Sequence, residues 1–380
     1  MLNKLAQIKF TIIISVLILA TFTGYLFRSE ATFSQTENRY LAARPAVSLS
    51  ALADGSFMNS FELYTKEQLP LRDMLIRLKA VCGELMFKNE NNGIARGKDA
   101  RLFEKLVRAD KQLDKNQAAI VNFVRQTDRD VYVCIVPNSY EILKGYTPSG
   151  FPGISQKERI DDLYGKLSMY SNVHPIDLND TLSAHADEYI YYRTDHHWTT
   201  QGAYLGYEKI CQEMGLDVLL ADAEKMRGKL KTSDDFYGTY QSKYRGIMGI
   251  VPDTIAYYDI PVKSYEAGGK KHDSLYDTDK LETYDKYAMF MYGNEGLSTV
   301  ESVPDEGLNR RNELILFKDS YANCMIPFLT YDYDRIIVID LRYYPDSVKE
   351  LIDEHSNADI LLMFNFMHFN EDNHFYRLTS

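Results

Sequence analysis

The chain has 380 residues, of which 45% are hydrophobic and 26% are charged, a composition typical of a folded protein and not of a disordered or fibrous one. Its formal net charge of -11 and the lack of a strongly basic block argue against a nucleic-acid-binding function. Neither a P-loop nor a GxGxxG motif occurs, so we expect no nucleotide cofactor.

Residues 10–27 are apolar and carry no charge. A helix rises about 1.5 Å per residue, so this segment is long enough to cross a membrane. Lys4 and Lys9 precede it and only Arg28 follows it closely, which predicts that residues 1–9 form a cytoplasmic tail and that the body is exported. A cleaved signal peptide is the alternative, but no clear small-x-small cleavage site follows the segment. We therefore expect an uncleaved signal anchor and a single-pass membrane protein.

The next segment, residues 28–90, is expected to be a stalk followed by a lead-in helix. Residues 28–60 are polar and irregular, with the turn-forming sequence ADGS among them. From Phe61 to Phe87 the spacing of the leucines predicts a helix, and Pro70 predicts a boundary or a fresh start within it.

Residues 91–380 are expected to form one α/β domain. Helical periodicity and compact apolar runs alternate along it and predict a mainly parallel sheet with helices on both faces. We expect a short strand at the end of 97–104, helices at 109–126, 156–170 and 346–355, and strands at 130–137, 313–317, 335–340 and 359–366, of which the last three are central. The segment at about 228–311 is rich in Tyr, Gly, Asp and Lys and is interpreted as a loop-and-hairpin insertion.

The apolar strand at 313–317 runs directly into Asp319 and Ser320. Ligands bind at the carboxyl ends of strands in open α/β sheets, so a serine at such a strand-to-helix turn is a candidate nucleophile. Backbone N–H groups of the next turn then face the group that the serine attacks, and Pro327 is expected to shorten or kink the helix that follows. The alternative is that Asp319 and Ser320 merely cap a helix.

A nucleophilic serine needs a base, and the base needs an acid to orient it. The sequence Asp195-His196-His197-Trp198 contains both residue types, and the acid and His197 can approach each other in a turn. An amphipathic helix follows, which Thr199 or Thr200 can cap and Gly215 can end, so the histidines are expected on a loop. Two alternatives stay open: a hydrogen-bonded turn with Trp198 packed in the core, and a metal site, although neighbouring histidines rarely point at one ion.

The stretch TDHHWTTQGAY resembles the signature of the DHHW protein family, and D-x-H-W with a later D-S-Y resembles the alginate acetylation proteins, whose domains are SGNH-hydrolase-like. The likeness extends to ENRYLAARP, YTKEQLPLRD, GKDARLF, KDSYANCMIPFL and IDLRYY. It implies an SGNH-hydrolase-like three-layer α/β/α fold and a triad of Asp195, His197 and Ser320 that moves acetyl groups onto polysaccharide hydroxyls. The chain departs from the pattern at Lys318, where alginate-type proteins usually have Gly.

Five further residues are candidates for the oxyanion or substrate site. Asn365 lies at the end of the last predicted strand and resembles in position the oxyanion-hole Asn of SGNH enzymes, and its alternative role is to cap a turn. Tyr321 follows the candidate nucleophile, and His196 is a candidate for substrate binding or for an alternative base. Asn138 and Arg342 follow predicted strands and are candidates for lining the pocket.

Together these observations predict an extracytoplasmic SGNH-like O-acyltransferase, of the O-acetyl type, or an acetylesterase that acts on cell-surface polysaccharide without a metal or other cofactor. A transferase needs an acyl donor on the outer face, for which a membrane-bound donor protein is a candidate partner. The 29 tyrosines offer amphipathic rings that can stack on sugars. Two alternatives remain: a non-catalytic glycan-binding or assembly protein with a degenerate SGNH fold, and a metal-dependent hydrolase.

Overall fold

The computed structural model describes residues 2–27, 29–34, 36–37, 39–216, 229–304 and 309–379. The chain divides into two compact units, one of residues 1–91 and 245–248 and one of residues 92–244 and 249–380. Parts of the predicted insertion, residue 228 and residues 305–308, lie outside the described residues.

The first unit begins with a long apolar helix. Within this helix, α1 (Leu2–Phe27), the stretch Ala6–Tyr25 is long and apolar enough to cross a membrane. The other elements of the unit are β1 (Phe33–Ser34), β2 (Arg39–Tyr40), α2 (Leu49–Ala53), α3 (Ser56–Glu67), α4 (Arg72–Leu85) and β3 (Glu90–Asn91), with β1 and β2 paired antiparallel. The predicted boundary near Pro70 is confirmed, because α3 ends before it and α4 begins after it.

The prediction that residues 28–60 are irregular is wrong where α2 lies and α3 begins. Ser48 caps α2 by accepting a hydrogen bond from the Ala51 N–H at 3.1 Å. The turn signal ADGS marks the junction between the two helices. Gly55 adopts a φ of 78° there, a conformation that glycine reaches without steric cost.

The second unit is built on an eight-stranded sheet in the order β11-β10-β12-β14-β13-β15-β6-β7. Five neighbouring strands, from β14 to β7, are parallel, and three antiparallel strands extend the β14 edge. The bounds are β6 (Val131–Val136), β7 (Val173–Pro175), β10 (Val262–Ala267), β11 (Lys270–His272), β12 (Leu297–Ser302), β13 (Arg311–Lys318), β14 (Tyr333–Ile339) and β15 (Asp359–Asn365). The predicted mainly parallel sheet and its three central strands are confirmed.

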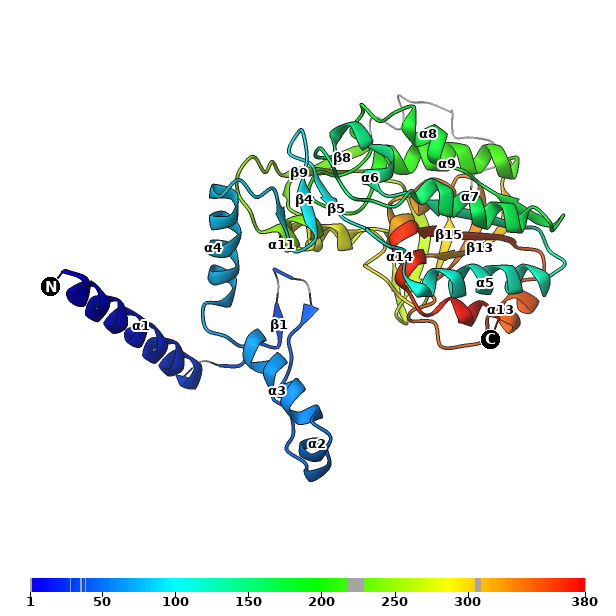
Figure 1. Cartoon of the computed structure of the whole chain (residues 1–380). Coiled ribbons are helices and arrows are strands. Elements are labelled where there is room, and N and C mark those ends of the chain that lie inside the picture. The colour runs from blue at the N-terminus through cyan, green and yellow to red at the C-terminus, as the bar shows by residue number, and fades with distance from the viewer. Residues whose placement is uncertain are drawn as a thin grey trace. The chain divides into compact units, whose positions relative to one another are not determined.

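Helices cover both faces of this sheet. Figure 1 shows α7, α8 and α9 on one side of β13 and β15, and α5 and α13 on the other. Among its described residues this unit has the α-helices α5 (Lys111–Arg125), α6 (Ser139–Ile142), α7 (Gln156–Leu167), α8 (Asn179–Ser183), α9 (Thr200–Met214), α11 (Thr239–Tyr244), α12 (Ile326–Leu329), α13 (Val348–Glu354) and α14 (Phe366–Glu371). A strand that is covered on both faces should have no exposed side chains, and residues 360–364 of β15 are all 0% exposed. Pro327 lies in the first turn of α12, which has only four residues.

The segment 228–311 is more than an insertion of loops and hairpins. Outside the main sheet, β8 (Leu230–Phe236) pairs antiparallel with β9 (Asp253–Tyr258), and β4 (Ile94–Arg96) pairs with β5 (Leu102–Glu104). However, β10, β11 and β12 belong to the main sheet, and Val300 of β12 lies opposite Ile336 of β14. Buried and less buried side chains alternate along β12, the period of a strand, which explains the lack of helical periodicity.

The strand register brings several chain segments to one edge. Lys318 at the end of β13 lies opposite Met363 of β15, and Asn365 at the end of β15 lies opposite Val136 of β6. Because these strands are parallel, the residues that follow them meet at the same edge. Ser320 is among those residues.

Candidate active site

Ser320 lies directly after the central strand β13, as the sequence predicts. It is the first residue of the 3-10 helix η4 (Ser320–Cys324), which Asp319 caps by accepting a hydrogen bond from the Tyr321 N–H at 2.9 Å. The other oxygen of Asp319 accepts a hydrogen bond from the Asn365 N–H at 2.6 Å, which ties the ends of β13 and β15 together. Capping by Asp319 and presentation of the Ser320 hydroxyl therefore occur in the same turn.

The loop that carries the two histidines is closed by main-chain pairing. Tyr191 pairs with Trp198 in an isolated antiparallel bridge, and the Thr199 N–H donates to the Ile190 carbonyl at 2.9 Å. Thr199 also caps α9, as predicted. Trp198 is fully buried, and its Nε1 donates to the Tyr321 carbonyl at 2.8 Å, so it ties the histidine loop to the turn of the serine.

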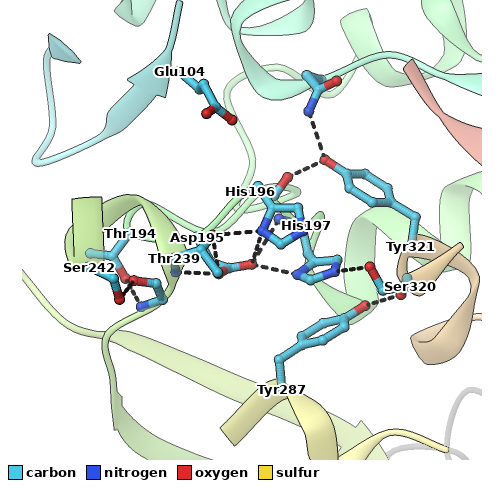
Figure 2. A network of polar contacts seen from close by, with 12 residues as sticks. Glu104, Thr194, Asp195, His196, His197, Thr239, Ser242, Tyr287, Ser320 and Tyr321 are labelled. Carbon is cyan, nitrogen blue, oxygen red and sulfur yellow. Dashed lines mark hydrogen bonds and ion pairs between the residues drawn. The ribbon is translucent and has the colours of Figure 1, made fainter. Parts of the chain in front are cut away.

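Asp195, His197 and Ser320 form one chain of hydrogen bonds (Figure 2). His197 Nε2 lies 2.8 Å from Ser320 Oγ, and His197 Nδ1 lies 2.5 Å from Asp195 Oδ1. Asp195 and His197 are buried. An ionised carboxylate only accepts hydrogen bonds, so Nδ1 carries the proton and the lone pair of Nε2 faces the serine hydroxyl. This is the arrangement in which an imidazole can activate a serine nucleophile.

The second oxygen of Asp195 is held by Thr239, and the neighbouring Gly238 leaves room for it. Thr239 donates to Oδ2 from its N–H at 2.7 Å and from Oγ1 at 3.0 Å. Gly238 approaches so closely that a Cβ there would lie 2.2 Å from the Cβ of Asp195. Only glycine leaves room for the carboxylate in this position.

Asp253, the first residue of β9, anchors the chain just before the histidine loop. Its Oδ1 accepts a hydrogen bond from the Arg193 N–H at 2.8 Å and another from the Tyr189 hydroxyl. Its Oδ2 accepts from the N–H of Thr194 at 2.8 Å and from its Oγ1 at 2.5 Å. Burial raises the pKa of Asp253, although these donors act in the opposite direction.

The electrostatics of the site favour a neutral base next to an ionised acid. Burial alone would raise the pKa of Asp195, but His196 and His197 hold it well below its usual range. Burial and the neighbouring His196 lower the pKa of His197 to about 4, although Asp195 acts in the opposite direction. His197 is therefore free to accept a proton at neutral pH.

Ser320 opens into a pocket of about 410 Å³. Five of the residues predicted from the sequence line it: Ser320, Tyr321, His196, Asn365 and Arg342. The remaining three predicted residues are buried and do not line the pocket: Asp195, His197 and Asn138. Ionisable side chains that the sequence did not single out also line it, among them Glu104, Lys243, His368 and Glu371. Both signs of charge are thus present around the serine.

Asn365 lines the pocket and caps a helix at the same time. Its Oδ1 accepts a hydrogen bond from the Met367 N–H at 3.0 Å, and its Nδ2 donates to the Val136 carbonyl at 3.3 Å and to Asn138 Oδ1 at 3.1 Å. Asn138 is 1% exposed, and its Nδ2 donates to the Tyr321 hydroxyl at 3.3 Å. Asn138 therefore supports two pocket residues from behind.

Lys318, the departure from the alginate-type pattern, does not disturb the turn of the serine. Its side chain is buried, with Nζ donating to Asn294 Oδ1 at 2.8 Å and lying 3.9 Å from Asp340 Oδ2. The guanidinium of Arg342 donates two hydrogen bonds to the same Asp340, at 2.9 and 2.5 Å. Burial lowers the pKa of Lys318 to about 8, although Asp340 acts in the opposite direction.

Asp195, His196 and His197 also bring three potential metal ligands within 4.8 Å of one another. Two of these atoms, Asp195 Oδ1 and His197 Nδ1, are 2.5 Å apart, which is a hydrogen-bond distance. Ligands of one zinc ion each lie about 2.0–2.2 Å from the metal and stand farther apart than this. The geometry therefore favours a proton between these two atoms over a shared metal ion.

Comparison with known proteins agrees with this fold. The family model described as DHHW protein matches residues 106–339. A DHHW family protein from Eubacterium siraeum is 23% identical with a TM-score of 0.61, and the match covers 76% of this chain and 95% of that one. Bacillus cereus PatB1, solved with a sulfonyl adduct, is 18% identical with a TM-score of 0.59, over 76% of this chain and 98% of that one. A search of curated proteins gave no match. The SGNH-hydrolase-like α/β/α fold predicted from the sequence is confirmed.

Proposed function

The chain belongs to the DHHW protein family, and from that premise we propose that it is a serine-dependent acyl-transfer enzyme, an O-acetyltransferase or acetylesterase of cell-surface polysaccharide. The observation that carries the proposal is the hydrogen-bonded chain from Ser320 through His197 to Asp195. A serine hydroxyl next to an imidazole that a buried carboxylate orients is the arrangement that acyl transfer requires.

In the proposed reaction Ser320 Oγ attacks the carbonyl carbon of an acyl donor. His197 Nε2 takes the serine proton, Asp195 stabilises the imidazolium, and the proton passes to the leaving group. An acceptor hydroxyl or water then attacks the acyl-serine. His197 takes the proton of this second nucleophile and returns it to Ser320 Oγ as the acyl–Oγ bond breaks.

The developing oxyanion needs hydrogen-bond donors close to Ser320. The Ser320 N–H stands at the start of η4, where N–H groups have no acceptor inside the helix, and we assign it as a donor. Asn365 lines the same pocket, but both hydrogens of its amide are directed at Val136 and Asn138. Its amide reaches an oxyanion only by giving up one of these bonds.

The proposed location is the outer face of a membrane. The apolar stretch Ala6–Tyr25 supports a signal anchor, and the positive charges of Lys4 and Lys9 before it support a cytoplasmic N-terminus. In this arrangement the acyl donor has to be supplied outside the membrane. A membrane-bound donor protein is the partner that we propose for the transferase.

The proposed acceptor is a polyhydroxylated polymer. The pocket is lined mainly by polar and charged side chains, with Glu104 and Glu371 contributing negative charge and Lys243 and Arg342 positive charge. Side chains of this kind bind hydroxyl groups as donors and as acceptors. The mixed charges support a polar ligand such as a glycan over a lipid.

Sulfonyl fluorides react with activated serine hydroxyls and give a direct test. The full-length protein in detergent should gain one sulfonyl group at Ser320 with phenylmethylsulfonyl fluoride and should hydrolyse p-nitrophenyl acetate. Ser320→Ala should abolish the labelling and lower the hydrolysis rate by about 10³-fold or more. Ser168→Ala, at an exposed serine that ends α7, is the matched control and should change neither.

Equal hydrolysis by wild type and Ser320→Ala would remove the nucleophile assignment. Chelation of divalent metals should leave the rate unchanged, because no step of the proposed reaction involves a metal ion. Loss of activity on chelation would favour the metal-dependent hydrolase instead.

A further inference from the structure

His196 stands beside the base and faces the same pocket as the serine. Its ring centroid lies 3.7 Å from that of His197, its side chain is 31% exposed, and it lines the pocket with Ser320. The proposed reaction uses His197 and leaves the imidazole of His196 without a role. A pocket-facing imidazole next to the reacting atoms is available to bind substrate.

The hydrogen bonds around Thr239 determine which nitrogen of His196 faces the pocket. Thr239 Oγ1 donates its single hydrogen to Asp195 Oδ2, so it must accept from His196 Nδ1, which lies 2.7 Å away. Nδ1 of His196 therefore carries a proton and donates it in a hydrogen bond to Thr239 Oγ1. Among the residues that the structure describes, Nε2 of His196 has no hydrogen-bond partner.

The two imidazoles share one orientation relative to Asp195. Nδ1 of His197 and Nδ1 of His196 lie 2.5 and 3.4 Å from Asp195 Oδ1. In both rings Nδ1 is thus the nitrogen engaged with the carboxylate side, and Nε2 of His197 is 2.8 Å from Ser320 Oγ. The two Nε2 atoms thus belong to neighbouring rings with centroids 3.7 Å apart, of which the ring of His197 contacts Ser320 and the ring of His196 lines the pocket.

We propose that these two nitrogens bind two adjacent hydroxyls of the acyl acceptor, and that His196 thereby selects vicinal diols. The inference rests on the proposed acyl transfer. The first hydroxyl oxygen bonds to the acyl carbon while the acyl–Oγ bond of Ser320 breaks, and its proton passes through His197 to Oγ. The neighbouring hydroxyl keeps its proton and hydrogen-bonds to His196 Nε2, as donor or as acceptor according to the charge of the ring.

Competition between two acceptors tests this selection. The full-length protein in detergent is given p-nitrophenyl acetate as donor and an equal mixture of cis-1,2-cyclohexanediol and cyclohexanol as acceptors, and the two acetate esters are measured by mass spectrometry. Wild type should favour the diol about tenfold, the value of one additional hydrogen bond. His196→Asn keeps a donor for Thr239 but lacks Nε2, and its preference should fall to about twofold, because the diol still has two hydroxyls.

Further variants separate binding from folding. His196→Gln, whose terminal amide can reach the position of Nε2, should restore part of the preference. His185→Ala, at a half-buried histidine paired with Glu188, should retain the wild-type value. An unchanged preference in His196→Asn, or no preference in wild type, would overturn the role of His196.

The rate of Ser320 acetylation tells a failure of the His196 proposal apart from a failure of the proposed function. It is followed as the p-nitrophenol released in the first turnover, before the acyl-serine is cleaved. Wild type that never acetylates Ser320 would overturn the proposed function and this inference together. Wild type that acetylates Ser320 but transfers without preference overturns this inference alone.

Discussion

The phenol ring of Tyr287 lies flat on the imidazole of His197, with the ring centroids 3.6 Å apart and the ring planes 10° from parallel. Its hydroxyl donates to the Ser320 carbonyl at 3.1 Å (Figure 2). One side chain therefore contacts both the candidate base and the turn that carries the candidate nucleophile. With Tyr287 on its face and Asp195 at its edge, the imidazole is held in one orientation.

Removal of this ring should loosen the base. Tyr287→Ala is expected to lower kcat for acetyl-ester hydrolysis by about 10- to 100-fold, because His197 can then turn away from Ser320. Tyr287→Phe keeps the stacked ring and loses only the hydroxyl, so its kcat should stay within about fivefold of wild type. An equal loss in the two variants would show that the hydroxyl, and not the stacked ring, is what holds the base.

Gly238 should tolerate no side chain. In Gly238→Ala the new Cβ would lie 2.2 Å from the Cβ and 2.3 Å from Oδ2 of Asp195, so the carboxylate or the backbone must move. We expect kcat to fall by about 100-fold with a measurable loss of thermal stability.

Gly165→Ala is the matched control, because nothing lies within 4 Å of its Cβ position on α7. It should keep full activity and gain about 0.5–1 kcal/mol of stability from helix propensity. Full activity in Gly238→Ala would contradict this account of the Asp195 support.

The low pKa of His197 has a consequence for the pH profile. The base works only when it is neutral, and burial together with His196 lowers its pKa to about 4. The value of kcat/KM should therefore stay constant from neutral pH to about pH 5 and decrease at lower pH. With a base of ordinary histidine pKa, kcat/KM would instead decrease near pH 6.5. His196→Asn removes a neighbouring positive charge and should move the midpoint upward. A wild-type midpoint at or above that of an ordinary histidine would be inconsistent with a buried base.

Lys318 should make stability rise with pH in the alkaline range. Its pKa is about 8 when folded and about 10.4 when unfolded. Between these values the unfolded chain binds a proton that the folded chain has released, so the free energy of unfolding rises by up to about 1.4 kcal/mol per pH unit. Below pH 8 both states are protonated and the effect vanishes.

Denaturant unfolding of wild type and Lys318→Met, at several pH values from about 7 to 10, measures how the free energy of unfolding changes with pH in each protein. The difference between the two slopes belongs to Lys318, because the other titrating groups are common to both. Lys349→Met is the matched control at an exposed lysine that pairs with Asp353, and it should follow the wild-type slope. The same slope in wild type and Lys318→Met would mean that Lys318 titrates normally in the folded protein.

Local patterns predicted the elements that carry the candidate site. The apolar runs that became β13, β14 and β15 could be identified because a strand buried on both faces needs nearly continuous apolar residues. Thr199 and Gly215 marked the ends of α9 because capping is decided within one turn of the chain. The motif around Asp195 and His197 was recognisable for the same reason, since both residues lie in one short loop.

The parts of the site that the sequence did not reveal depend on contacts between distant segments. Thr239 holds Asp195, and Gly238 leaves room for it, from a segment interpreted as an insertion. Tyr287 stacks on His197 from the 3-10 helix η3 (Lys286–Met289). The sequence spacing of such residues follows no pattern that could identify them. A hydrogen bond between residues that are tens of positions apart depends on the path of the backbone and not on the period of a helix or strand. The strands, the caps and the residue types of the candidate triad could thus be read from local patterns. That Ser320 and His197 lie within hydrogen-bond reach, and which side chains keep them there, became known from the folded chain, because packing brings these distant segments together.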